Sequence, residues 1–570
     1  MAELQELGNV IETDVLVIGG GVAGLWAAKK AGEQGGRVTI VDKGPIGYTS
    51  QAYFAQAGQA GALPGEDIDA WIKEIVYLGD GLVEQDMVEI VLRQSYDRIR
   101  DYEDLGVNFR KYPDGSYHLL TRLGGQEHLA AFITDPVGFG GKAMIRALFG
   151  EVQKLGVQLV SKVCITNLLI RDGRVGGAVG FNIRDGQFYT FKARAVVLAS
   201  GDCTFKGQSA MNRFATGDGI AMAYAAGAEL RNMEFPQMWV IMRGRLWDGL
   251  AFLLPAGGRF VNAQNEEFME KYAPQLKCNI AFNYLVRGMA LEARAGRGPF
   301  YFDPTRIDPA VMGDFEHYSG WMGSNVKKLI AAGEKVFTEP QEWEVAALKL
   351  MGISTDTEMQ TRVPGLFIGG RLRSIDPGIR FGGWSLATAV AFGYRAGEYA
   401  ARYAAANEPE EISAGEVVAL KEGVFAPLGK VGMEPQYVLT ELQKAYFQVG
   451  VLVLKSQSTL EEALGRIVEI RDELLPRMGA RDLHYLMNLR EVMSLTLITE
   501  LSVRASLART ESRAAHYRED YPSRDDKNWL KWIMLSRREG KASLRTEPVP
   551  LERYPVKPSQ YYMDNFVFPE

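Results

Sequence analysis

A glycine-rich segment near the start of the chain has the spacing of a phosphate-binding turn. Its sequence, Gly19-Gly-Gly21-Val-Ala-Gly24, fits the pattern GxGxxG. In this pattern the first glycine turns the chain, the second admits a pyrophosphate and the third lets a helix pack against a strand, while the helix amino terminus attracts the phosphate. Asp42 ends the next apolar stretch, where a carboxylate can bind ribose hydroxyls. These residues predict a dinucleotide-binding site rather than an incidental glycine-rich turn.

Arginine and histidine side chains are the candidate groups for substrate chemistry. Arg243 and Arg245 stand beside Trp239 and Trp247, and a forked guanidinium binds carboxylate, phosphate or sulfate with two hydrogen bonds. The other candidates are His128, His317 and Arg380. We therefore predict a small anionic substrate. Two structural alternatives stay open, a solvated loop for the first two arginines and a purely structural role for His128.

Composition narrows the classes of partner and compartment. The chain has 64 lysine and arginine residues against 70 aspartate and glutamate residues, a net charge of −6, which argues against nucleic acid as the main partner. No stretch approaches the roughly 20 apolar residues that cross a bilayer, and no secretory signal is visible, so we expect a cytoplasmic protein. Cys164, Cys203 and Cys278 are too dispersed to hold an iron–sulfur cluster. We expect no metal site in this chain.

The elements that must position these residues alternate between strands and helices. Residues 14–18, which are largely apolar, predict a buried strand, residues 22–34 a helix and residues 37–41 the next strand. The glycine segment therefore lies inside a βαβ unit. Further strands are expected at residues 158–160, 177–179, 195–199 and 365–369, and a helix of small residues at 385–405.

Changes in this alternation divide the chain into domains. Residues 236–344 are rich in glycine, proline and aromatic residues, which predicts an inserted α+β capping domain. Residues 412–515 have the periodicity of a helical bundle, and the proline-rich residues 516–570 predict an extended tail. The expected fold class is α/β plus α, with a Rossmann-like nucleotide-binding domain formed by residues 1–235 and 345–406.

Several segments together resemble one known family. Ser50-Gln-Ala-Tyr-Phe-Ala-Gln-Ala-Gly58 resembles the flavin loop of the succinate dehydrogenase and fumarate reductase flavoproteins, which also include aspartate oxidase and adenylylsulfate reductase. Val196-Val-Leu-Ala-Ser-Gly201 resembles the second flavin strand of the family, and Ala215-Thr-Gly-Asp-Gly219 resembles the entry to its capping domain. Ala508-Arg-Thr-Glu-Ser-Arg-Ala-Ala-His516 resembles its helical-domain signature. The resemblance runs from about residue 10 to residue 545.

The resemblance implies FAD in an extended conformation, with its ring between the nucleotide-binding domain and the cap. Gln51 stands where the family often has a histidine bonded covalently to the flavin, so we expect noncovalent FAD. The helix that follows Arg380-Phe-Gly-Gly-Trp-Ser385 can direct its positive end at the flavin. The residues expected to bind FAD are Gly19, Gly21, Gly24, Asp42, Lys43, Ser50, Gln51, Gln56, Ala57, Gly58, Ser200, Gly201, Asp218, Arg371, Arg380, Gly383, Ser385 and Leu386.

Departures from the family lie where the resemblance implies substrate chemistry. Phe282 takes the place of the arginine that delivers a proton in the dicarboxylate enzymes, and phenylalanine transfers no proton. Neither expected substrate histidine is present, at residues 348–350 or around residues 376–377. Arg371 replaces a flavin-binding glutamate, while Arg380 is retained. Simple fumarate or succinate chemistry is therefore not expected.

Two classes of function remain open at this point. The first is an FAD-dependent oxidoreductase subunit that exchanges a hydride with a small anionic substrate, and electrons with a ferredoxin-like iron–sulfur subunit. An adenylylsulfate reductase-like alpha subunit is one form of it, because that relative also lacks the arginine of the cap. The second is a flavin electron-relay subunit without a small-molecule substrate. In either case any attachment to a membrane is expected to run through partner subunits.

Overall fold

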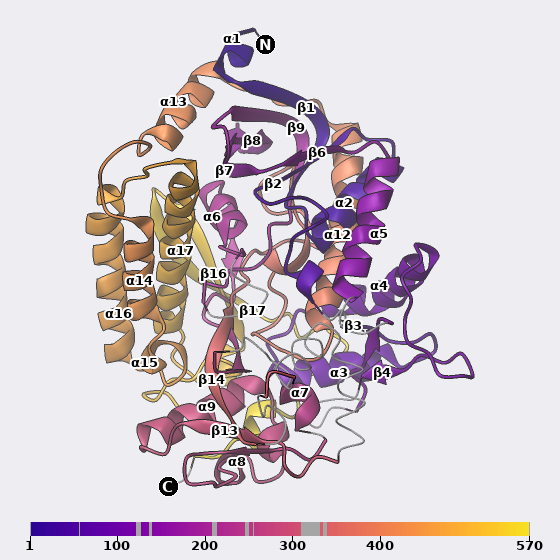
Figure 1. Ribbon diagram of the computed structural model, residues 1–570, viewed down its shortest axis with the longest axis vertical. Helices are drawn as coiled ribbons and strands as arrows, with labels where there is room; N and C mark the ends of the chain where they lie inside the picture. Colours follow the sequence, from indigo (N-terminus) through magenta and orange to yellow (C-terminus); the bar gives the residue numbers. More distant parts are fainter. Residues whose placement is uncertain are drawn as a thin grey trace.

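A seven-stranded sheet forms the centre of the nucleotide-binding domain (Figure 1). The computed structural model describes residues 2–55, 58–120, 127–135, 140–207, 214–244, 250–254, 256–308, 331–333 and 339–568. The strand order is β6-β2-β1-β9-β8-β7, and β15 pairs with β9. These strands are β1 (Asn9–Ile18), β2 (Val38–Asp42), β6 (Gln158–Ser161), β7 (Val163–Arg171), β8 (Arg174–Asn182), β9 (Phe188–Leu198) and β15 (Leu366–Ile368).

Parallel pairing brings several strand ends to one edge of this sheet. β1 pairs in parallel with both β2 and β9, and β15 pairs in parallel with β9. The segments that follow Ile18, Asp42, Leu198 and Ile368 therefore leave the sheet at the same edge. β7 and β8 form an antiparallel hairpin that continues into β9. The predicted strands at residues 14–18, 37–41, 195–199 and 365–369 all lie in this sheet, which agrees with their largely apolar composition.

Two helices of this domain pack closely against each other through small residues. α12 (Trp384–Ala406) approaches α2 (Val22–Glu33) so closely that a Cβ on Gly393 or Gly397 would lie 2.4 Å or 2.2 Å from a backbone oxygen of α2. The other helices of this domain are α1 (Ala2–Leu7), α3 (Ile68–Leu78), α4 (Gln85–Asp104), α5 (Gly140–Lys154) and α6 (Asp218–Ala225). A small sheet, β3 (Gly58–Ala60), β5 (Ala131–Ile133) and β4 (Leu119–Leu120), lies beside α4 and α12.

The inserted segment forms a separate α+β lobe, which lies at the bottom of Figure 1. Its sheet has the order β11-β14-β13-β12. The strands are β11 (Gln237–Met242), β12 (Arg259–Val261), β13 (Phe300–Asp303) and β14 (Gln341–Lys349), and the helices are α7 (Leu250–Leu253), α8 (Met269–Tyr272) and α9 (Phe282–Arg294). The predicted capping domain covered residues 236–344, and the sheet of this lobe extends from Gln237 to Lys349.

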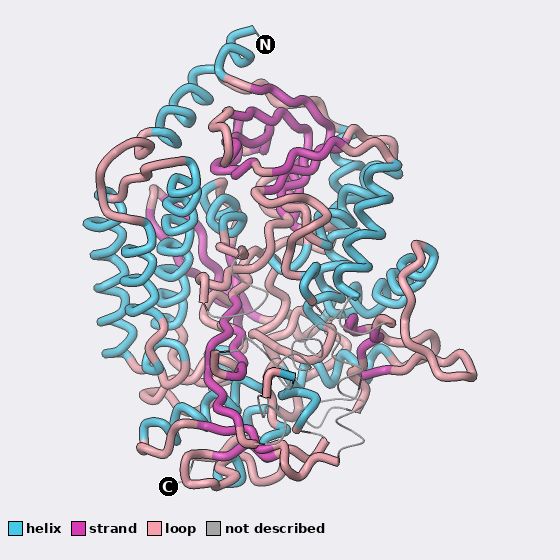
Figure 2. The backbone as a smooth tube through the Cα atoms, viewed as in Figure 1, coloured by secondary structure: helices cyan, strands magenta, loops and turns pink. Residues whose placement is uncertain are grey.

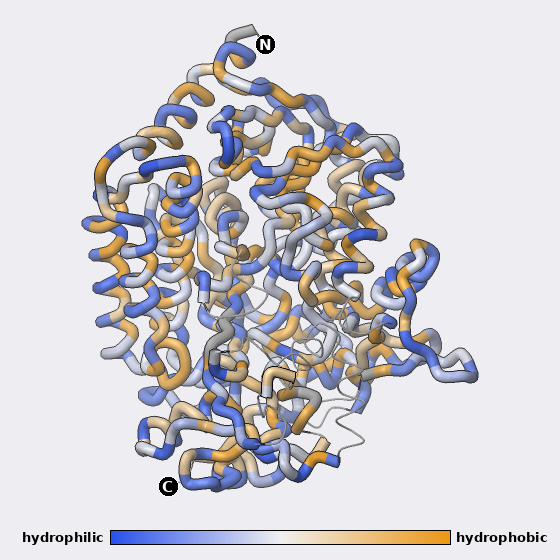
Figure 3. Tube along the Cα trace, in the orientation of Figure 1, coloured by the Kyte–Doolittle hydropathy of each residue, from blue (hydrophilic) through white to orange (hydrophobic). Residues whose placement is uncertain are grey.

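A helical bundle occupies the left of Figure 2, apart from the strands of the nucleotide-binding domain. It contains α14 (Pro435–Tyr446), α15 (Val449–Leu452), α16 (Gln457–Glu469) and α17 (Leu483–Ala508). The preceding helix, α13 (Ala414–Phe425), instead packs beside α1 and the large sheet. The helices of the bundle interleave hydrophilic and hydrophobic residues, as Figure 3 shows, which is typical of helices that bury one face. α17 lies between the other helices of the bundle and α6 of the nucleotide-binding domain.

The carboxyl-terminal segment is partly ordered into strands. After α18 (Asp526–Trp529), β16 (Lys531–Arg538) and β17 (Lys541–Pro548) form a hairpin, and β16 also pairs with β10 (Leu230–Arg231). The sequence pattern predicted extended chain here rather than a hairpin. Beyond residue 548 the chain continues without strands or α-helices to the last described residue, Phe568, and contacts α3, α8 and α9.

Candidate active site

The glycine segment is a tight turn from β1 into α2. Gly19 has a φ of 117°, and a Cβ there would lie 2.4 Å from the backbone oxygen of Ala199. A Cβ on Gly24 would lie 1.8 Å from the backbone oxygen of Gly19. Gly21 precedes α2, where no side chain caps the helix and a Cβ would meet nothing closer than Ser50 at 3.5 Å. The first backbone N–H groups of α2 are therefore accessible to a phosphate.

Asp42 holds the shape of this turn. Its Oδ2 atom accepts a hydrogen bond of 2.6 Å from the backbone N–H of Gly20, and its Oδ1 atom accepts one of 2.5 Å from Gly44. Each carboxylate oxygen has further lone pairs for a hydroxyl group. The residue predicted to contact a ribose therefore lies next to the phosphate-binding turn, and it also stabilises that turn.

Gln51 lies at the carboxyl end of β9. Its Nε2 atom donates a hydrogen bond of 2.7 Å to Oδ1 of Asp202, a fully buried residue, and its Oε1 atom lies 3.9 Å from where a Cβ on Gly201 would stand. Lys349, the last residue of β14, places Nζ 3.8 Å from Oδ2 of Asp202. The position expected to face the flavin edge is therefore part of a polar chain from the nucleotide-binding domain to the cap.

Two serines lie close to the same edge. Ser50 accepts a hydrogen bond of 3.0 Å from the backbone N–H of Tyr53, which orders the loop before β3. Ser200 has a buried hydroxyl oxygen with no hydrogen-bond partner among the described residues. A buried hydroxyl group is normally satisfied, so this atom is available to a bound molecule.

Arg371 is a buried arginine at the carboxyl end of β15. Arg371 is 7% exposed. Its only side-chain hydrogen bond within the described chain is donated by Nη1 to Oγ1 of Thr388 at 3.5 Å. The Nε and Nη2 atoms of Arg371 have no partner there. Burial lowers the pKa of the guanidinium, an effect that the nearby charges of Asp376 and Asp202 oppose.

Arg380 lies between two aromatic rings of the cap. Its Cζ atom is 4.1 Å from the ring centroid of Trp239, on β11, and 5.0 Å from that of Phe282, the first residue of α9. Nζ of Lys349 lies 5.4 Å from the same Trp239 ring. Cation–π contacts of this kind hold a guanidinium without neutralising its charge. Arg380 can therefore still bind an anion.

The start of α12 is fixed by close packing and by one buried acid. Gly383 precedes α12 with a φ of 80°, and a Cβ there would lie 2.4 Å from the backbone nitrogen of Ala60. Asp376 accepts hydrogen bonds from the backbone N–H groups of Gly378 and Ile379 and from Nε1 of Trp384. Burial raises the pKa of Asp376, although Arg371 and these hydrogen bonds act against the shift. Ser385 and Leu386 lie in the first turn of this helix.

Lys43 and Asp218 form an ion pair with each other. Nζ of Lys43 lies 2.8 Å from Oδ2 of Asp218 and 2.7 Å from Oε1 of Glu491, on α17. The two carboxylates raise the pKa of Lys43 in spite of its burial. Both predicted FAD-binding residues therefore also join the nucleotide-binding domain to the helical bundle.

Of the remaining predicted residues, those that the structure describes are not gathered around Arg380. The side chain of Arg243 is 60% exposed and pairs with Oε1 of Glu342, so the alternative of a solvated loop describes it. His128 is exposed, and its backbone N–H donates to Glu74 at 2.9 Å. Gly58 begins β3 and pairs with Ile133. Arg245, His317, Gln56 and Ala57 lie outside the described residues.

The structure adds residues that motif reading did not select. Asp202 follows the predicted Gly201 directly, and Lys349 lies in the segment where an expected histidine is missing. Their common signal is a charged residue that follows a short apolar stretch, residues 195–199 before Asp202 and residues 345–348 before Lys349. Thr388 has no such signal, because only the fold brings it to Arg371.

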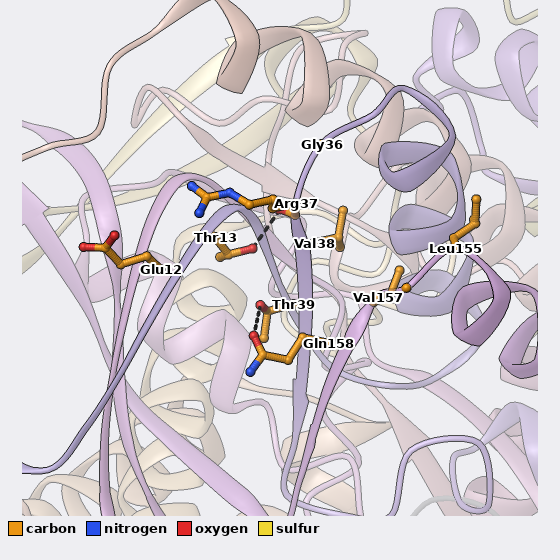
Figure 4. Close-up of a pocket in the computed structure, with 10 residues that line it drawn as sticks. Glu12, Thr13, Gly36, Arg37, Val38, Thr39, Leu155, Val157 and Gln158 are labelled. Atoms are coloured by element: carbon orange, nitrogen blue, oxygen red, sulfur yellow. Dashed lines mark hydrogen bonds between the residues drawn. The ribbon is translucent and has the colours of Figure 1, made fainter.

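A cavity of about 310 Å³ lies elsewhere, and none of the predicted residues lines it (Figure 4). Its lining includes Thr13, Arg37 and Gln158, near the first residues of β2 and β6. Thr13 donates to the backbone oxygen of Arg37 at 2.8 Å, and Thr39 donates to Gln158 at 3.2 Å. This cavity is at the opposite end of the parallel strands from the glycine turn, so it is not part of the candidate active site.

Comparison with known proteins assigns the chain to a family. Residues 14–386 match the family described as FAD binding domain, and residues 440–561 match the one described as fumarate reductase flavoprotein C-term. The chain belongs to the fumarate reductase and succinate dehydrogenase flavoproteins. This confirms the resemblance that the motifs indicated, and it makes the protein an FAD-dependent oxidoreductase of that family.

Relatives of this flavoprotein match over almost its whole length. One subunit of the fumarate reductase (CoM/CoB) of Methanothermobacter marburgensis is 28% identical, over 93% of this chain and 98% of its own. The succinate dehydrogenase flavoprotein subunit of Rickettsia conorii is 29% identical, over 94% and 95%. Among solved structures, E. coli quinol fumarate reductase FrdA has a TM-score of 0.88 at 23% identity, over 97% and 99% of the two chains, which shows the shared fold. Adenylylsulfate reductase from Archaeoglobus fulgidus shares the fold at a TM-score of 0.81 and 23% identity, over 96% and 97%.

The residues at the strand ends of this flavoprotein fit FAD. The glycine turn offers helix N–H groups to a pyrophosphate, and Asp42 offers a carboxylate beside it. Arg371 and Ser200 supply buried polar atoms that need partners. These groups lie along one edge of the sheet, in agreement with a dinucleotide bound in an extended conformation.

Within the described residues of the flavoprotein, neither a metal site nor a membrane span is found. No group of three or more histidine, cysteine, aspartate or glutamate side chains is placed to hold a metal ion. No helix in these ranges is long and apolar enough to cross a membrane. Cys164 and Cys203 are buried, Cys278 is half-buried, and burial raises the pKa of the Cys278 thiol to about 12.

Proposed function

We propose that this flavoprotein exchanges a hydride with a small anionic substrate other than fumarate or succinate, and electrons with an iron–sulfur partner protein. The observation that carries this proposal is the contact between Phe282 and Arg380, whose ring centroid and Cζ atom are 5.0 Å apart. Bound FAD accepts a hydride from an organic molecule and passes single electrons onward. The residues of the chain must bind the anion, exclude water and provide any proton.

Arg380 is the proposed anion-binding residue. The rings of Trp239 and Phe282 contact its guanidinium and the residue is half-buried, so less water screens the charge than at the protein surface. A guanidinium in such surroundings binds carboxylate or phosphoryl oxygens strongly, through two parallel hydrogen bonds. Lys349 places a second positive charge at the same tryptophan. Part of the Lys349 charge is balanced by Asp202, whose Oδ2 atom lies 3.8 Å from Nζ, so Arg380 is the main candidate for binding the anion.

Phe282 is the reason to exclude ordinary dicarboxylate chemistry. It stands where the family resemblance implies an arginine that delivers a proton to the substrate, and a benzyl side chain has no exchangeable proton. Its ring is largely buried against Arg380. A substrate with an apolar body next to its anionic group, such as an unsaturated acyl thioester, suits this wall better than a second carboxylate does.

The partner is proposed from the chemistry of electron transfer and from the names of relatives. Single electrons leaving FAD need an acceptor, and the three cysteines of this chain are too few for an ordinary cluster with four thiolate ligands. Relatives are named as subunits of fumarate reductase and succinate dehydrogenase. We therefore expect a separate iron–sulfur subunit in the cytoplasm, through which any membrane attachment would run.

The test is anaerobic reoxidation of the photoreduced holoprotein. Fumarate, an unsaturated acyl thioester and adenylylsulfate, each of which can accept two electrons, are added separately while the absorbance of oxidised flavin is followed. We expect one anion class other than the four-carbon dicarboxylates to restore the absorbance. Arg380→Gln should abolish that response, while Arg402→Gln, which changes an exposed arginine on α12, should retain it. Rapid reoxidation by fumarate would contradict the proposal.

A flavin electron relay is the second candidate. It is favoured by the two rings that cover Arg380, since they leave less room for a substrate. The same experiment separates the two functions. A relay is indicated if none of the small molecules restores the absorbance and an oxidised ferredoxin does.

A further inference from the structure

Arg371 carries a buried charge whose hydrogen bonds are incomplete. The guanidinium group has five N–H donors and remains protonated in proteins. In the described chain its one hydrogen bond is the long contact of 3.5 Å to Thr388, and Nε and Nη2 have no acceptor although the residue is 7% exposed. Such an arrangement is costly unless a bound molecule supplies the missing acceptors.

The position of Arg371 identifies the bound molecule as FAD. The residue follows Gly370, where a Cβ would lie 2.7 Å from the Cβ of Ala23, in the first turn of α2. Its contact Thr388 lies near the start of α12. Arg371 is therefore placed between the amino-terminal turns of two helices, both of which attract negative charge. α2 is the helix of the phosphate-binding turn.

Neighbouring acids do not satisfy the two free nitrogens. Asp376 already accepts three hydrogen bonds, from Gly378, Ile379 and Trp384. Asp202 accepts one from Gln51 and lies 3.8 Å from Lys349. These carboxylates balance part of the charge of Arg371 at longer range, but neither forms a hydrogen bond with it.

We propose that Arg371 donates its Nε–H and Nη2–H groups to oxygen atoms of FAD and that its positive charge raises the reduction potential of the flavin. Reduced FAD carries more negative charge than oxidised FAD, so a fixed cation in a medium of low polarity stabilises the reduced state more. The family resemblance places a glutamate at this position, so the charge has the opposite sign in this chain. The proposal rests on FAD binding and not on the proposed substrate.

The experiment measures FAD affinity and reduction potential without any substrate. Arg371→Gln, Arg371→Lys and Arg371→Glu are compared with the exposed control Arg402→Gln. Apoprotein is titrated with FAD by fluorescence, and the potential of each holoprotein is found against reference dyes. We expect Arg371→Gln to weaken the binding of oxidised FAD about tenfold, because hydrogen bonds from a charged donor are lost. The same variant should weaken the binding of reduced FAD about a hundredfold, because reduced FAD carries more negative charge. The tenfold difference lowers the two-electron potential by about 30 mV.

The remaining variants keep the proposal falsifiable if Arg371→Gln folds poorly. Arg371→Lys keeps the charge, so its potential should stay close to that of the original protein while FAD binds more weakly. Arg371→Glu should lower the potential further than Arg371→Gln does. A potential that is the same in the glutamine and glutamate variants as in the original protein would overturn the proposal, whatever happens to FAD affinity. Failure to find a substrate would leave this result unaffected.

Discussion

At the scale of single residues, the residues predicted to bind FAD fall into two groups: those whose polar atoms form hydrogen bonds within the protein, and those with polar atoms that do not. Asp42, Lys43 and Asp218 each have protein partners within 2.8 Å, so they stabilise the surface that is predicted to bind FAD. Ser200 and Arg371 are buried with atoms that lack partners in the described chain. The second group is the more informative one, because a folded protein rarely leaves buried donors without acceptors unless a ligand provides them.

The first prediction concerns the bond between Gln51 and the flavin. An amide nitrogen is not a nucleophile, and Gln51 already uses its Nε2 atom to donate to Asp202 at 2.7 Å. We therefore expect noncovalent FAD. Acid precipitation of the holoprotein should leave yellow FAD in the supernatant and a pellet without flavin fluorescence on a denaturing gel.

Gln51→Ala is the matched variant for this prediction. It removes the amide without adding a nucleophile, so it should release FAD in the same way as the original protein does. Flavin fluorescence that stays with the denatured chain in the original protein and disappears in Gln51→Ala would contradict the prediction. That result would show that Gln51, despite its chemistry, carries the cofactor.

Motif residues could be predicted from the sequence, whereas the contacts across domains could not. The glycine turn and Asp42 belong to one βαβ unit, so local spacing is sufficient to place them together. The pairing of Gln51 with Asp202 and the stacking of Arg380 on Trp239 join residues more than 100 positions apart. Those contacts depend on how β9, β11 and the segment before α12 are arranged in the fold, which local sequence does not specify. The exposure of Arg243 could not be predicted for the same reason, because its neighbours in sequence do not show which way its side chain points.

At the scale of elements, the accuracy of the predicted strands follows from how each strand is buried. β1, β2, β9 and β15 are parallel and covered on both faces in their paired segments, so they appear as apolar runs. β7 and the β16–β17 hairpin were not predicted. β17 is exposed along most of its length and has few apolar residues, so it contains no apolar stretch from which a strand could be predicted. Antiparallel strands of this kind depend on pairing that the local sequence does not specify.

The position of α9 depends on the carboxyl-terminal tail. Ala281, directly before Phe282, donates its backbone N–H to the hydroxyl oxygen of Tyr562 at 2.9 Å. The hydroxyl of Tyr284 donates to Asp80 at 2.9 Å, and Asp80 also accepts from the backbone N–H of Met563 at 3.0 Å. The tail therefore ties the start of α9 to the nucleotide-binding domain. Because Phe282 begins this helix, the tail also fixes the ring that covers Arg380.

The second prediction is that Tyr562→Phe loosens the start of α9. The change removes the acceptor of the Ala281 N–H group. Leaving a buried donor unsatisfied costs about 1–3 kcal/mol, and the lower end of this range applies here because the bond is partly buried. We expect faster hydrogen–deuterium exchange in the first turn of α9 and no change in α2. Tyr437→Phe, an exposed position on α14, is the control and should leave both helices unchanged. Equal exchange in the first turn of α9 with and without the Tyr562 hydroxyl would contradict this role of the tail.

At the scale of the whole molecule, buried ion pairs hold the domains together. Lys43 connects the end of β2 to Glu491 on α17, at 2.7 Å. Arg509, at the end of α17, pairs with Glu234 at 2.8 Å, and both side chains are fully buried. Arg509 also donates to the backbone oxygens of Trp529 and Lys531. One guanidinium therefore joins the helical bundle, the entry to the cap and the carboxyl-terminal segment.

The third prediction is that Arg509→Met destabilises the assembled molecule strongly. Burial raises the pKa of Glu234, and the charge of Arg509 is a main influence that opposes this shift. Removing Arg509 therefore leaves a buried carboxylate without its direct ion-pair partner, which costs about 3–5 kcal/mol. We expect release of FAD and loss of tertiary circular dichroism at clearly lower urea concentration, while Arg402→Met, which changes an exposed arginine, should leave the transition unchanged.

Adding Glu234→Gln to Arg509→Met should restore part of the lost stability, because the uncompensated charge is then gone. If the double variant is as unstable as the sum of the single variants, the two residues act independently, and the domains are joined by packing rather than by this pair.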